Sequence, residues 1–161
     1  MPFTLERLAP SDLPLLRAWL VQPYVAQWFG DPDEWMGEIA ANLDADWVWY
    51  FRADLAGVPT GFVQCYDTSR APPGEWSTQP PGTVGVDYVV GRPEVLGQGY
   101  GTQLLQEFVA YVTAQWRPRR IIADPDPDNG PSVRVAQRCG FQWDEDTGLM
   151  VKEVHPEVAQ P

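Results

Sequence analysis

The hydrophobic pattern is most informative from Val84 to Ala110. In its first part, apolar residues occur at alternate positions and also between them, so that both faces of an extended chain are apolar: Val84, Val86, Tyr88 and Val90 alternate with Gly85, Asp87 and Val89. This pattern favours a strand buried inside a sheet. A glycine-rich turn follows, and then apolar residues recur at helical spacing: Leu104, Leu105, Phe108 and Val112. The stretch therefore predicts a buried strand, a turn and an amphipathic helix.

The remaining pattern predicts a mixed sheet with helices packed on it. We expect further strands at residues 3–8, 46–52, 60–66, 120–123, 141–143 and 147–154, and helices at residues 13–20, 34–43 and 131–138. Pro23 is expected to end the first helix, and Asp33 to cap the second. A helix connects the strand of Asp87 to residues 120–123, so these two strands should be parallel. A loop rich in Pro, Gly, Ser and Thr covers residues 67–82, and such long loops often carry function.

Length and composition indicate one globular domain over residues 1–161. No apolar run is long enough to span a membrane, and the N-terminus lacks the pattern of a signal peptide. Cys65 and Cys139 lie far apart in the sequence without metal-type spacing, so we interpret them as free thiols in a reducing cytoplasm. The single histidine, His155, argues against a histidine-based metal site or catalytic triad.

The formal net charge is −11, which argues against a nucleic-acid partner and favours a cationic one. An acidic surface that only keeps the protein in solution is an equally good explanation. The basic residues are uneven, however, because most of them follow the strand of Asp87. An anionic ligand held by the second half of the chain fits this asymmetry.

The turn before the long helix contains Gly97, Gly99 and Gly101. Alternate glycines let the backbone turn tightly and approach a ligand closely. A turn that opens a helix presents free amides at the positive end of the helix dipole, which suits a phosphate or pyrophosphate. The spacing G-x-G-x-G differs from the dinucleotide-binding pattern, and a turn without any ligand remains an alternative.

Two carboxylates mark the ends of neighbouring strands. Asp87 lies within the buried strand, where a carboxylate is costly unless it is paired, solvated by a cleft or used in chemistry. Asp124 follows the strand at residues 120–123, although capping is an equally good explanation for it. Ligands of such sheets bind at the carboxyl ends of parallel strands. A carboxylate there can bind an ammonium group and take its proton. Trp28 is balanced between core packing and the lining of a pocket.

Three segments carry a resemblance to a known family. They are Leu96-Gly97-Gln98-Gly99-Tyr100-Gly101 with the TQLLQEFV that follows, the run Asp124-Pro125-Asp126-Pro127-Asp128-Asn129, and SVRVAQRCGF ending at Phe141. The chain resembles the GCN5-related N-acetyltransferases, and among them the aminoglycoside 6′-N-acetyltransferases of the cassette-borne resistance type. The generic family has Gln or Arg at the position of Leu96, and this departure narrows the match to that group. Trp28 and the Gly74-Glu75-Trp76 segment match more loosely.

The resemblance implies an α/β (α+β) fold, with a mixed central sheet, flanking helices and a splayed parallel pair in the middle. It implies acetyl-CoA as co-substrate, with its pyrophosphate cradled by the amides of Gly97, Gln98, Gly99, Tyr100, Gly101 and Thr102. The pantetheine arm would follow residues 88–90, and an N–H near Val89 would serve the thioester carbonyl, which makes Val89 and Val90 coenzyme contacts. Asn129 would hold the arm. The residues expected around the acceptor are Trp28, Glu75, Asp87, Asp124 and Asp146, with Asp87 and Asp124 catalytic.

One departure concerns the proton for the leaving thiolate. Family members commonly carry a tyrosine for this purpose in the helix after the asparagine, and the matching residue here is Ala136. Tyr100, Cys139 and a water molecule remain alternatives.

Together these features predict a cytoplasmic acetyl-CoA-dependent N-acetyltransferase that acts on a primary amine of a small cationic acceptor such as an aminoglycoside or a polyamine. An enzyme of the same fold that acetylates a siderophore precursor or a protein amine is the alternative, and a non-catalytic acetyl-CoA-binding module is another. We expect a small-molecule partner, no nucleic acid, no membrane, no metal, and a monomer or homodimer.

Overall fold

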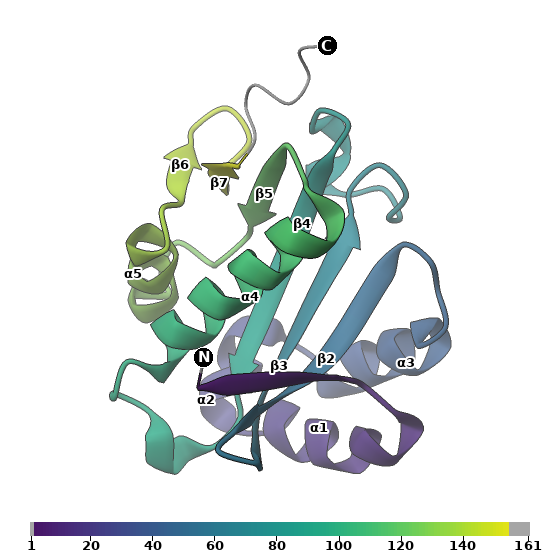
Figure 1. The fold of residues 1–161 in the computed structure, drawn as a ribbon, viewed down its shortest axis with the longest axis vertical. Helices are drawn as coiled ribbons and strands as arrows, with labels where there is room; N and C mark the ends of the chain where they lie inside the picture. Colours follow the sequence, from purple (N-terminus) through teal and green to yellow (C-terminus); the bar gives the residue numbers. More distant parts are fainter. Residues whose placement is uncertain (1, 155–161) are drawn as a thin grey trace.

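The computed structural model describes residues 2–154, so His155 lies outside the described residues. A single seven-stranded sheet runs through the molecule in the order β1-β2-β3-β4-β5-β7-β6 (Figure 1). Its strands are β1 Phe3–Arg7, β2 Val48–Leu55, β3 Val58–Asp67, β4 Thr83–Val90, β5 Arg120–Ala123, β6 Gln142–Asp144 and β7 Leu149–Glu153. Within residues 2–154, only β4 and β5 pair in parallel, and every other pairing is antiparallel. The predicted mixed sheet and its parallel pair are confirmed.

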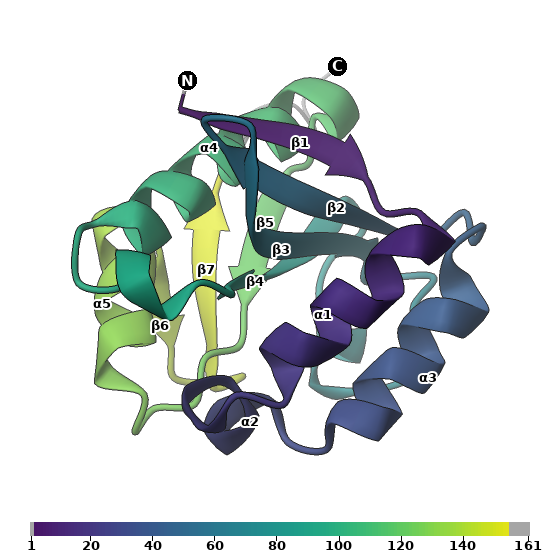
Figure 2. The same cartoon turned by 90° about the horizontal axis from the view of Figure 1, so that it is seen from below.

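Five α-helices cover the two faces of the sheet: α1 Leu13–Leu20, α2 Pro23–Phe29, α3 Pro32–Asn42, α4 Tyr100–Trp116 and α5 Gly130–Arg138. The first three lie on one face, and α4 and α5 lie on the other (Figure 2). Each layer has its own core. Leu16, Ile39 and Phe62 belong to the first, and Leu104, Phe108 and Ile121 belong to the second. Burial of these apolar side chains is what holds the helices to the sheet.

The region between the first two predicted helices differs from the prediction. The first helix ends at Leu20, but Pro23 begins the additional helix α2 rather than closing a helix. Proline suits the first helical turn because its missing N–H has no partner there in any case. Asp31, and not Asp33, caps α3, since its side chain accepts a hydrogen bond of 2.9 Å from the Asp33 amide.

Helix α2 is anchored to the end of β4. The Tyr24 hydroxyl donates to the Val90 carbonyl at 2.7 Å, and Gln22 Nε2 donates to the Gly91 carbonyl at 2.7 Å. The missed helix therefore lies directly beside the open end of the parallel pair.

The parallel pair separates before either strand ends. Its last paired residues are Gly85 on β4 and Ile122 on β5. Asp87 lies two positions beyond the first, and Asp124 lies two positions beyond the second. The two carboxylates thus stand at corresponding places on either side of a gap between the strands. This gap is the splay that the sequence predicted.

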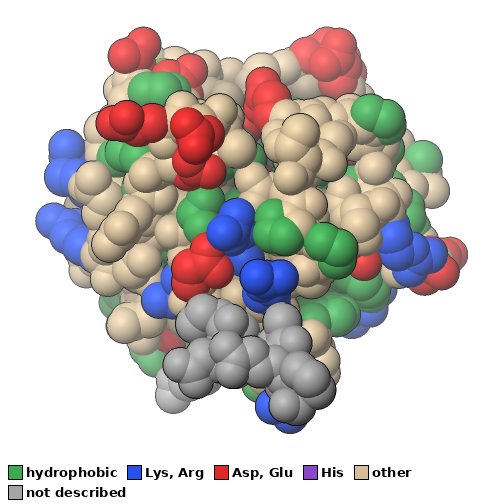
Figure 3. Space-filling model, turned by 90° about the horizontal axis from the view of Figure 1, so that it is seen from above, with side chains coloured by type: hydrophobic (Ala, Val, Ile, Leu, Met, Phe, Trp, Pro, Cys, Tyr) green, Lys and Arg blue, Asp and Glu red, His purple; other side chains and the backbone are tan. Residues whose placement is uncertain are grey.

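Three further observations concern the predictions about membrane spans, cysteines and surface charge. Between residues 2 and 154, no helix has the length and apolar character needed to cross a lipid bilayer. Cys65 and Cys139 are both buried and free of disulfide bonds, as expected. On the face shown in Figure 3, acidic side chains gather toward the top of the view, and basic side chains lie across the middle and at the sides without forming a continuous patch.

Candidate active site

The glycine-rich turn has the backbone conformation that the sequence suggested. Gly97 and Gly99 have φ angles of +76° and +84°, which side-chain-bearing residues rarely adopt. No heavy atom lies within 4 Å of a Cβ built at either position, so backbone conformation and not crowding requires glycine. Gly99 caps α4, and the first bond of the helix joins the Gln103 amide to its carbonyl at 3.1 Å. The amides of Tyr100, Gly101 and Thr102 are therefore available to an anion.

A cavity of about 550 Å³ adjoins this turn, and we call it the turn cavity. Most of the predicted coenzyme contacts line it: Val89, Val90, Gly97, Gly99, Tyr100, Gly101, Thr102 and Asn129. Gln98 is not a lining residue, and its side chain donates to the Glu94 carbonyl at 3.0 Å. Helix α5 adds Arg134 and Arg138, which lie one turn apart and bring positive charge to the cavity wall.

Asn129 has a structural duty at the same time. It caps α5, where its side chain accepts a hydrogen bond of 3.4 Å from the Ser132 amide, and it is buried. Its predicted place beside the pantetheine arm is compatible with this duty, because a side-chain amide keeps two N–H donors free.

The free amides of β4 can be deduced from its pairing with β3. Residues of an antiparallel pair alternate between those that exchange hydrogen bonds and those that do not. The Gly91 amide donates to the Thr60 carbonyl at 2.8 Å, which places Val89 in a bonded pair with Phe62. The amides that point into the gap are therefore those of Tyr88 and Val90. A backbone donor for the thioester carbonyl, which we predicted near Val89, would therefore come from Tyr88 or Val90 and not from Val89 itself.

On the other side of the gap lies a second cavity of about 440 Å³, which we call the aromatic cavity. Seven aromatic side chains line it: Trp28, Phe29, Trp35, Trp47, Tyr50, Tyr66 and Trp76. They come from α2, α3, the residue before β2, the strands β2 and β3, and the loop before β4, so no local motif predicts them. Three carboxylates share this wall, namely Glu38, Asp87 and Asp124. Aromatic faces and carboxylates together suit a cationic ligand.

Trp28 lines the aromatic cavity as well as the turn cavity, which settles the choice between core and pocket in favour of the pocket. Its neighbour Phe29 lines both cavities too, and the Phe29 carbonyl accepts a hydrogen bond of 2.7 Å from the Trp35 indole. The two aromatic residues at the end of α2 thus stand between the two cavities.

Asp87 is half-buried on the wall of the aromatic cavity. One of its oxygens accepts a hydrogen bond of 2.8 Å from Gln64 Nε2, which comes from the facing residue of β3. Burial raises the pKa of Asp87 to about 6; the hydrogen bond from Gln64 opposes this shift, and the charge of Glu38 adds to it. A carboxylate with this pKa is mostly ionised at neutral pH and is a stronger base than an ordinary aspartate.

Asp124 faces the same space from β5 but is more open to solvent. Partial burial of its carboxyl, the hydrogen bonding and charge of Glu75, and the charges of Asp87 and Asp126 raise the pKa of Asp124 to about 6. Glu75 lies in the short 3₁₀ helix Glu75–Thr78 and is exposed. The long loop therefore brings Glu75 beside Asp124, although Glu75 lines neither the turn cavity nor the aromatic cavity.

Asp146 lies away from this cluster. It is exposed in the turn between β6 and β7, where its amide donates to Asp144 Oδ1 at 3.1 Å, and it lines none of the three cavities described. The geometry gives no support to a role for Asp146 in acceptor binding.

A small cavity of about 80 Å³ shares lining residues with both larger cavities. Its lining includes Asp87, Asp124, Tyr88, Ser132 and Ala136. Ala136, where family members commonly carry a tyrosine, thus lines open space between β4 and α5. Among residues 2–154, no group of three or more His, Cys, Asp or Glu side chains is arranged to hold a metal ion.

Burial of Asp87 has a consequence for stability. Its pKa is raised in the folded protein, so the native state binds more protons than the unfolded chain between about pH 4 and pH 6, and stability falls as pH rises through this window. We expect Asp87→Asn to increase the free energy of unfolding at pH 8 by up to about 2–3 kcal/mol, and to have little effect below pH 4. Urea denaturation at both pH values measures this difference.

The matched control is Asp46→Asn. Asp46 is exposed, and its carboxylate accepts a hydrogen bond from Arg70. This bond and the positive charge of Arg70 lower the pKa of Asp46. This substitution should not stabilise the protein at pH 8. An equal gain from both substitutions would instead indicate a general effect of net charge.

Comparisons with known proteins agree with this geometry. A family model described as an acetyltransferase (GNAT) domain matches residues 9–148. The aminoglycoside N(6′)-acetyltransferase type 1 of Klebsiella pneumoniae is 27% identical over 147 residues, which cover 86% of this chain and 73% of that protein. The lysine N-acyltransferase MbtK of Mycolicibacterium paratuberculosis is 24% identical over 152 residues, which cover 91% of this chain and 69% of that protein.

Among solved structures, the aminoglycoside acetyltransferase AAC(6′)-Ib in complex with paromomycin and acetyl-CoA superimposes with a TM-score of 0.85. The two chains are 25% identical, and the superposition covers 100% of this chain and 99% of the other. The likeness therefore extends over the whole fold.

Proposed function

The chain belongs to the acetyltransferase (GNAT) family, and we propose that it transfers the acetyl group of acetyl-CoA to a primary amine of a small cationic acceptor of the aminoglycoside type. One observation carries this proposal. Asp87 and Asp124 stand at corresponding places beyond the parallel pairing, on the wall that the aromatic cavity shares with the small cavity. The glycine-rich turn, which suits the coenzyme, lies on the other side of the same gap.

The residues of the chain account for the chemical step. An ammonium group has no lone pair, so the acceptor must lose a proton before or during attack on the thioester carbonyl. Asp87 is placed to take this proton, directly or through one water molecule. The free amide of Tyr88 or Val90 is placed to stabilise the negative charge on the carbonyl oxygen. Asp124, with Glu75 nearby, attracts and orients the cation.

Coenzyme binding rests on the turn cavity. Free amides at the start of α4 suit the pyrophosphate, and Arg134 and Arg138 add attraction for its negative charge. The pantetheine arm would follow residues 88–90, where β4 has no neighbour on the side of the gap.

Two observations bear on the acceptor. The AAC(6′)-Ib neighbour, whose complex holds paromomycin, matches this chain over its full length, and this supports an aminoglycoside. The relative MbtK acts on lysine and supports the alternative of a lysine-like amine in a siderophore precursor or a protein. The wall of aromatic and acidic side chains accepts a cation in either case.

A screen of acceptors tests the proposal. Release of CoA would be followed with aminoglycosides, polyamines and Nα-blocked lysine, and mass spectrometry would identify the acetylated amine. We expect turnover with aminoglycosides. Acetylation of blocked lysine alone would support the alternative, and binding of acetyl-CoA without turnover of any amine would favour a non-catalytic module. The cytoplasmic location and the monomeric or homodimeric state remain predictions from the sequence.

The glycine-rich turn provides a separate prediction about the coenzyme. Gly99→Val places a side chain where the pyrophosphate must approach and strains a φ of +84°, so acetyl-CoA affinity should fall by at least about tenfold. Isothermal titration calorimetry measures this affinity.

Gly57→Val is the matched control, because Gly57 has a φ of +79° with the same open surroundings but lies in the turn between β2 and β3. Its stability loss should be similar while coenzyme affinity is retained. Unchanged affinity in folded Gly99→Val would remove the turn from the coenzyme site.

A further inference from the structure

The acetyl transfer leaves a negative charge in an unfavourable place. When the new C–N bond forms and the C–S bond breaks, the sulfur of CoA keeps the electron pair and becomes a thiolate. It does so in the gap beside Asp87 and Asp124, in a protein with a net charge of −11. Like charges disfavour each other at short range, so a proton donor near the sulfur would lower the barrier.

We propose that Tyr88 is the general acid of this enzyme and donates its phenolic proton to the departing sulfur of CoA. The inference rests on the proposed function, and it adds a catalytic residue on β4 that replaces the tyrosine absent at position 136.

The alternation of side chains along β4 places the proposed acid, Tyr88, and the proposed base, Asp87, on opposite faces of the sheet beside the gap. Successive residues of a strand point to opposite faces of the sheet. Asp87 lines the aromatic cavity on the face of α1, α2 and α3, whereas Tyr88 packs with the core beneath α4 and α5. The acceptor amine thus approaches from one face and the coenzyme leaves along the other. The amine meets Asp87 and the coenzyme sulfur meets Tyr88, and these two proton-transfer groups are neighbours in the sequence.

The position of the Tyr88 ring brings its hydroxyl to the junction of the cavities. A Cβ built on Gly101 would lie 3.8 Å from Tyr88 Cε2 and 3.7 Å from Val135, so the ring lies between the start of α4 and helix α5. Few residues line both the turn cavity and the small cavity: Trp28, Phe29, Tyr88, Asn129 and Ser132. The sulfur must lie near this set, because it joins the pantetheine arm to the acetyl group that reaches Asp87.

Chemistry selects Tyr88 within this set. Of the five side chains, only Tyr88 and Ser132 carry a hydroxyl, and a phenol is by far the stronger acid. Burial raises the pKa of Tyr88, although a hydrogen bond with Ser132 partly opposes the shift. The phenol therefore holds its proton at neutral pH, as a general acid must.

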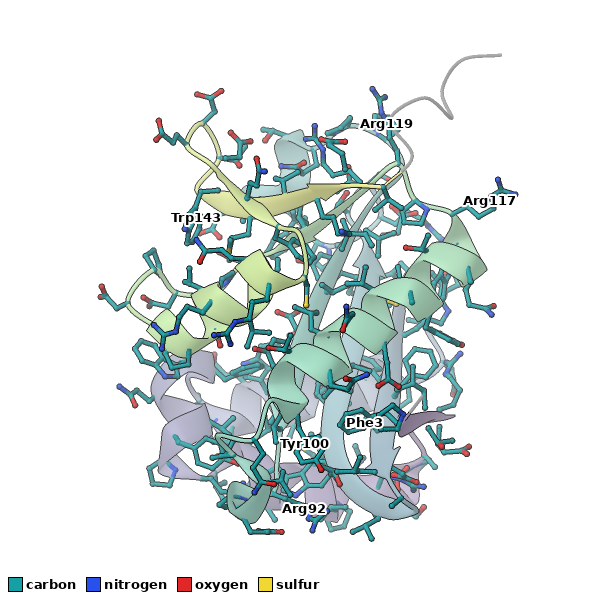
Figure 4. The ribbon with its side chains drawn as sticks, turned by 60° about the vertical axis from the view of Figure 1, so that its left-hand side comes forward. Phe3, Arg92, Tyr100, Arg117, Arg119 and Trp143 are labelled. Atoms are coloured by element: carbon teal, nitrogen blue, oxygen red, sulfur yellow. The ribbon has the colours of Figure 1, made fainter. Side chains whose placement is uncertain are left out.

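The other two candidate residues lie elsewhere. Tyr100 begins α4 and lines the turn cavity but not the small cavity. Its ring lies edge-on to the ring of Phe3, with 6.3 Å between the two ring centroids (Figure 4). Cys139 is buried, lines none of the three cavities described, and its thiol donates to the Thr102 carbonyl at 3.6 Å.

The protons balance over the cycle. The ammonium first loses one proton, which Asp87 takes and passes to solvent. The neutral amine nitrogen then bonds to the acetyl carbon and loses a second proton to Asp87, while the sulfur takes one proton from Tyr88 as its bond to carbon breaks. Asp87 then releases this proton to solvent, and the Tyr88 phenolate takes one back from solvent. The net products are the amide, free CoA and one proton.

An equilibrium measurement tests the contact without any acceptor. The thiol of bound CoA would be titrated by the ultraviolet absorbance of its thiolate, with the complex of desulfo-CoA as the blank that cancels tyrosine absorbance. A hydrogen bond from Tyr88 stabilises the thiolate, so the pKa of the bound thiol should be about one unit lower in the parent protein than in Tyr88→Phe. Tyr100→Phe, which also removes a phenol from the turn cavity, should leave that pKa unchanged.

Kinetics supply the second measurement. With the best acceptor from the screen, Tyr88→Phe should lower kcat at least about tenfold with little change in CoA affinity. Equal thiol pKa values in the parent and Tyr88→Phe, or unchanged kcat, would overturn the inference. A lowered thiol pKa in a protein that acetylates no amine would uphold the contact and overturn the proposed function instead.

Discussion

Asp87→Asn is expected to lower kcat/KM for the acceptor by about 10²–10⁴-fold, the usual contribution of a well-placed general base. Asn has nearly the same shape and keeps an oxygen that can accept from Gln64, so the local packing at β3 and β4 should survive. It cannot take a proton from the acceptor. Steady-state kinetics with the best acceptor measure the loss, and calorimetry should show unchanged acetyl-CoA affinity.

Asp128→Asn is the matched control for this experiment. Asp128 is an exposed acid in the loop before α5 and lines none of the three cavities described, so the substitution removes the same charge without touching the site. Its kcat/KM should stay close to that of the parent. Parent-like activity in Asp87→Asn would exclude Asp87 as the base.

The pH profile gives a second view of the same group. Activity that needs ionised Asp87 should be full well above pH 6 and should fall as pH drops below about 6, because the pKa of Asp87 is raised to about 6. Asp124 titrates in the same range, so the measured value belongs to the pair. In Asp124→Asn, removal of a neighbouring negative charge should shift the acid limb of the profile to lower pH.

Asp124→Asn is expected to raise KM for cationic acceptors by about 10–100-fold while kcat changes little. A hydrogen bond between charged groups is worth about 1.5–3 kcal/mol, and this substitution removes charge attraction while the base stays in place. In the parent protein, added salt should raise KM as well, because it screens the attraction. The salt dependence should be weaker in the variant.

Asp146→Asn separates the two views of the acceptor site. The sequence placed Asp146 among the acceptor contacts, whereas the structure places it in the exposed turn between β6 and β7. Its KM should equal that of the parent at each salt concentration. A rise in KM for Asp146→Asn as large as that for Asp124→Asn would show that the overall negative field, and not a local contact, attracts the acceptor.

The geometry of the proposed coenzyme half of the site was largely predictable from the sequence. Its parts are consecutive, since β4, the glycine-rich turn and α4 follow one another, and the glycines at 97 and 99 indicate positive φ angles by their residue type alone. Asp87 was conspicuous for the same local reason, because a carboxylate in an apolar strand needs an explanation. Short-range sequence patterns suffice where neighbours in the chain are neighbours in space.

The acceptor half depended on tertiary structure. Helix α2 was missed because seven residues are too few to show a clear helical periodicity. The hydrogen bonds that anchor this helix to the end of β4 place Trp28 and Phe29 beside the gap. The aromatic cavity is assembled from seven separate segments, so no spacing in the sequence reveals it. The same limit applied to Tyr88, which looked like one more apolar residue of a buried strand.

The sequence by itself thus determined the family, the order of most elements and the residues whose local chemistry is unusual. Only the tertiary structure decided which of the acids meet. Asp87 and Asp124 come together because the parallel pairing stops at Gly85 and Ile122, whereas Asp146 lies apart from them in the turn between β6 and β7. Charge and hydrophobic periodicity are properties of single segments. A site requires residues of different segments to lie close together, and the packing of strands and helices sets the distances between them.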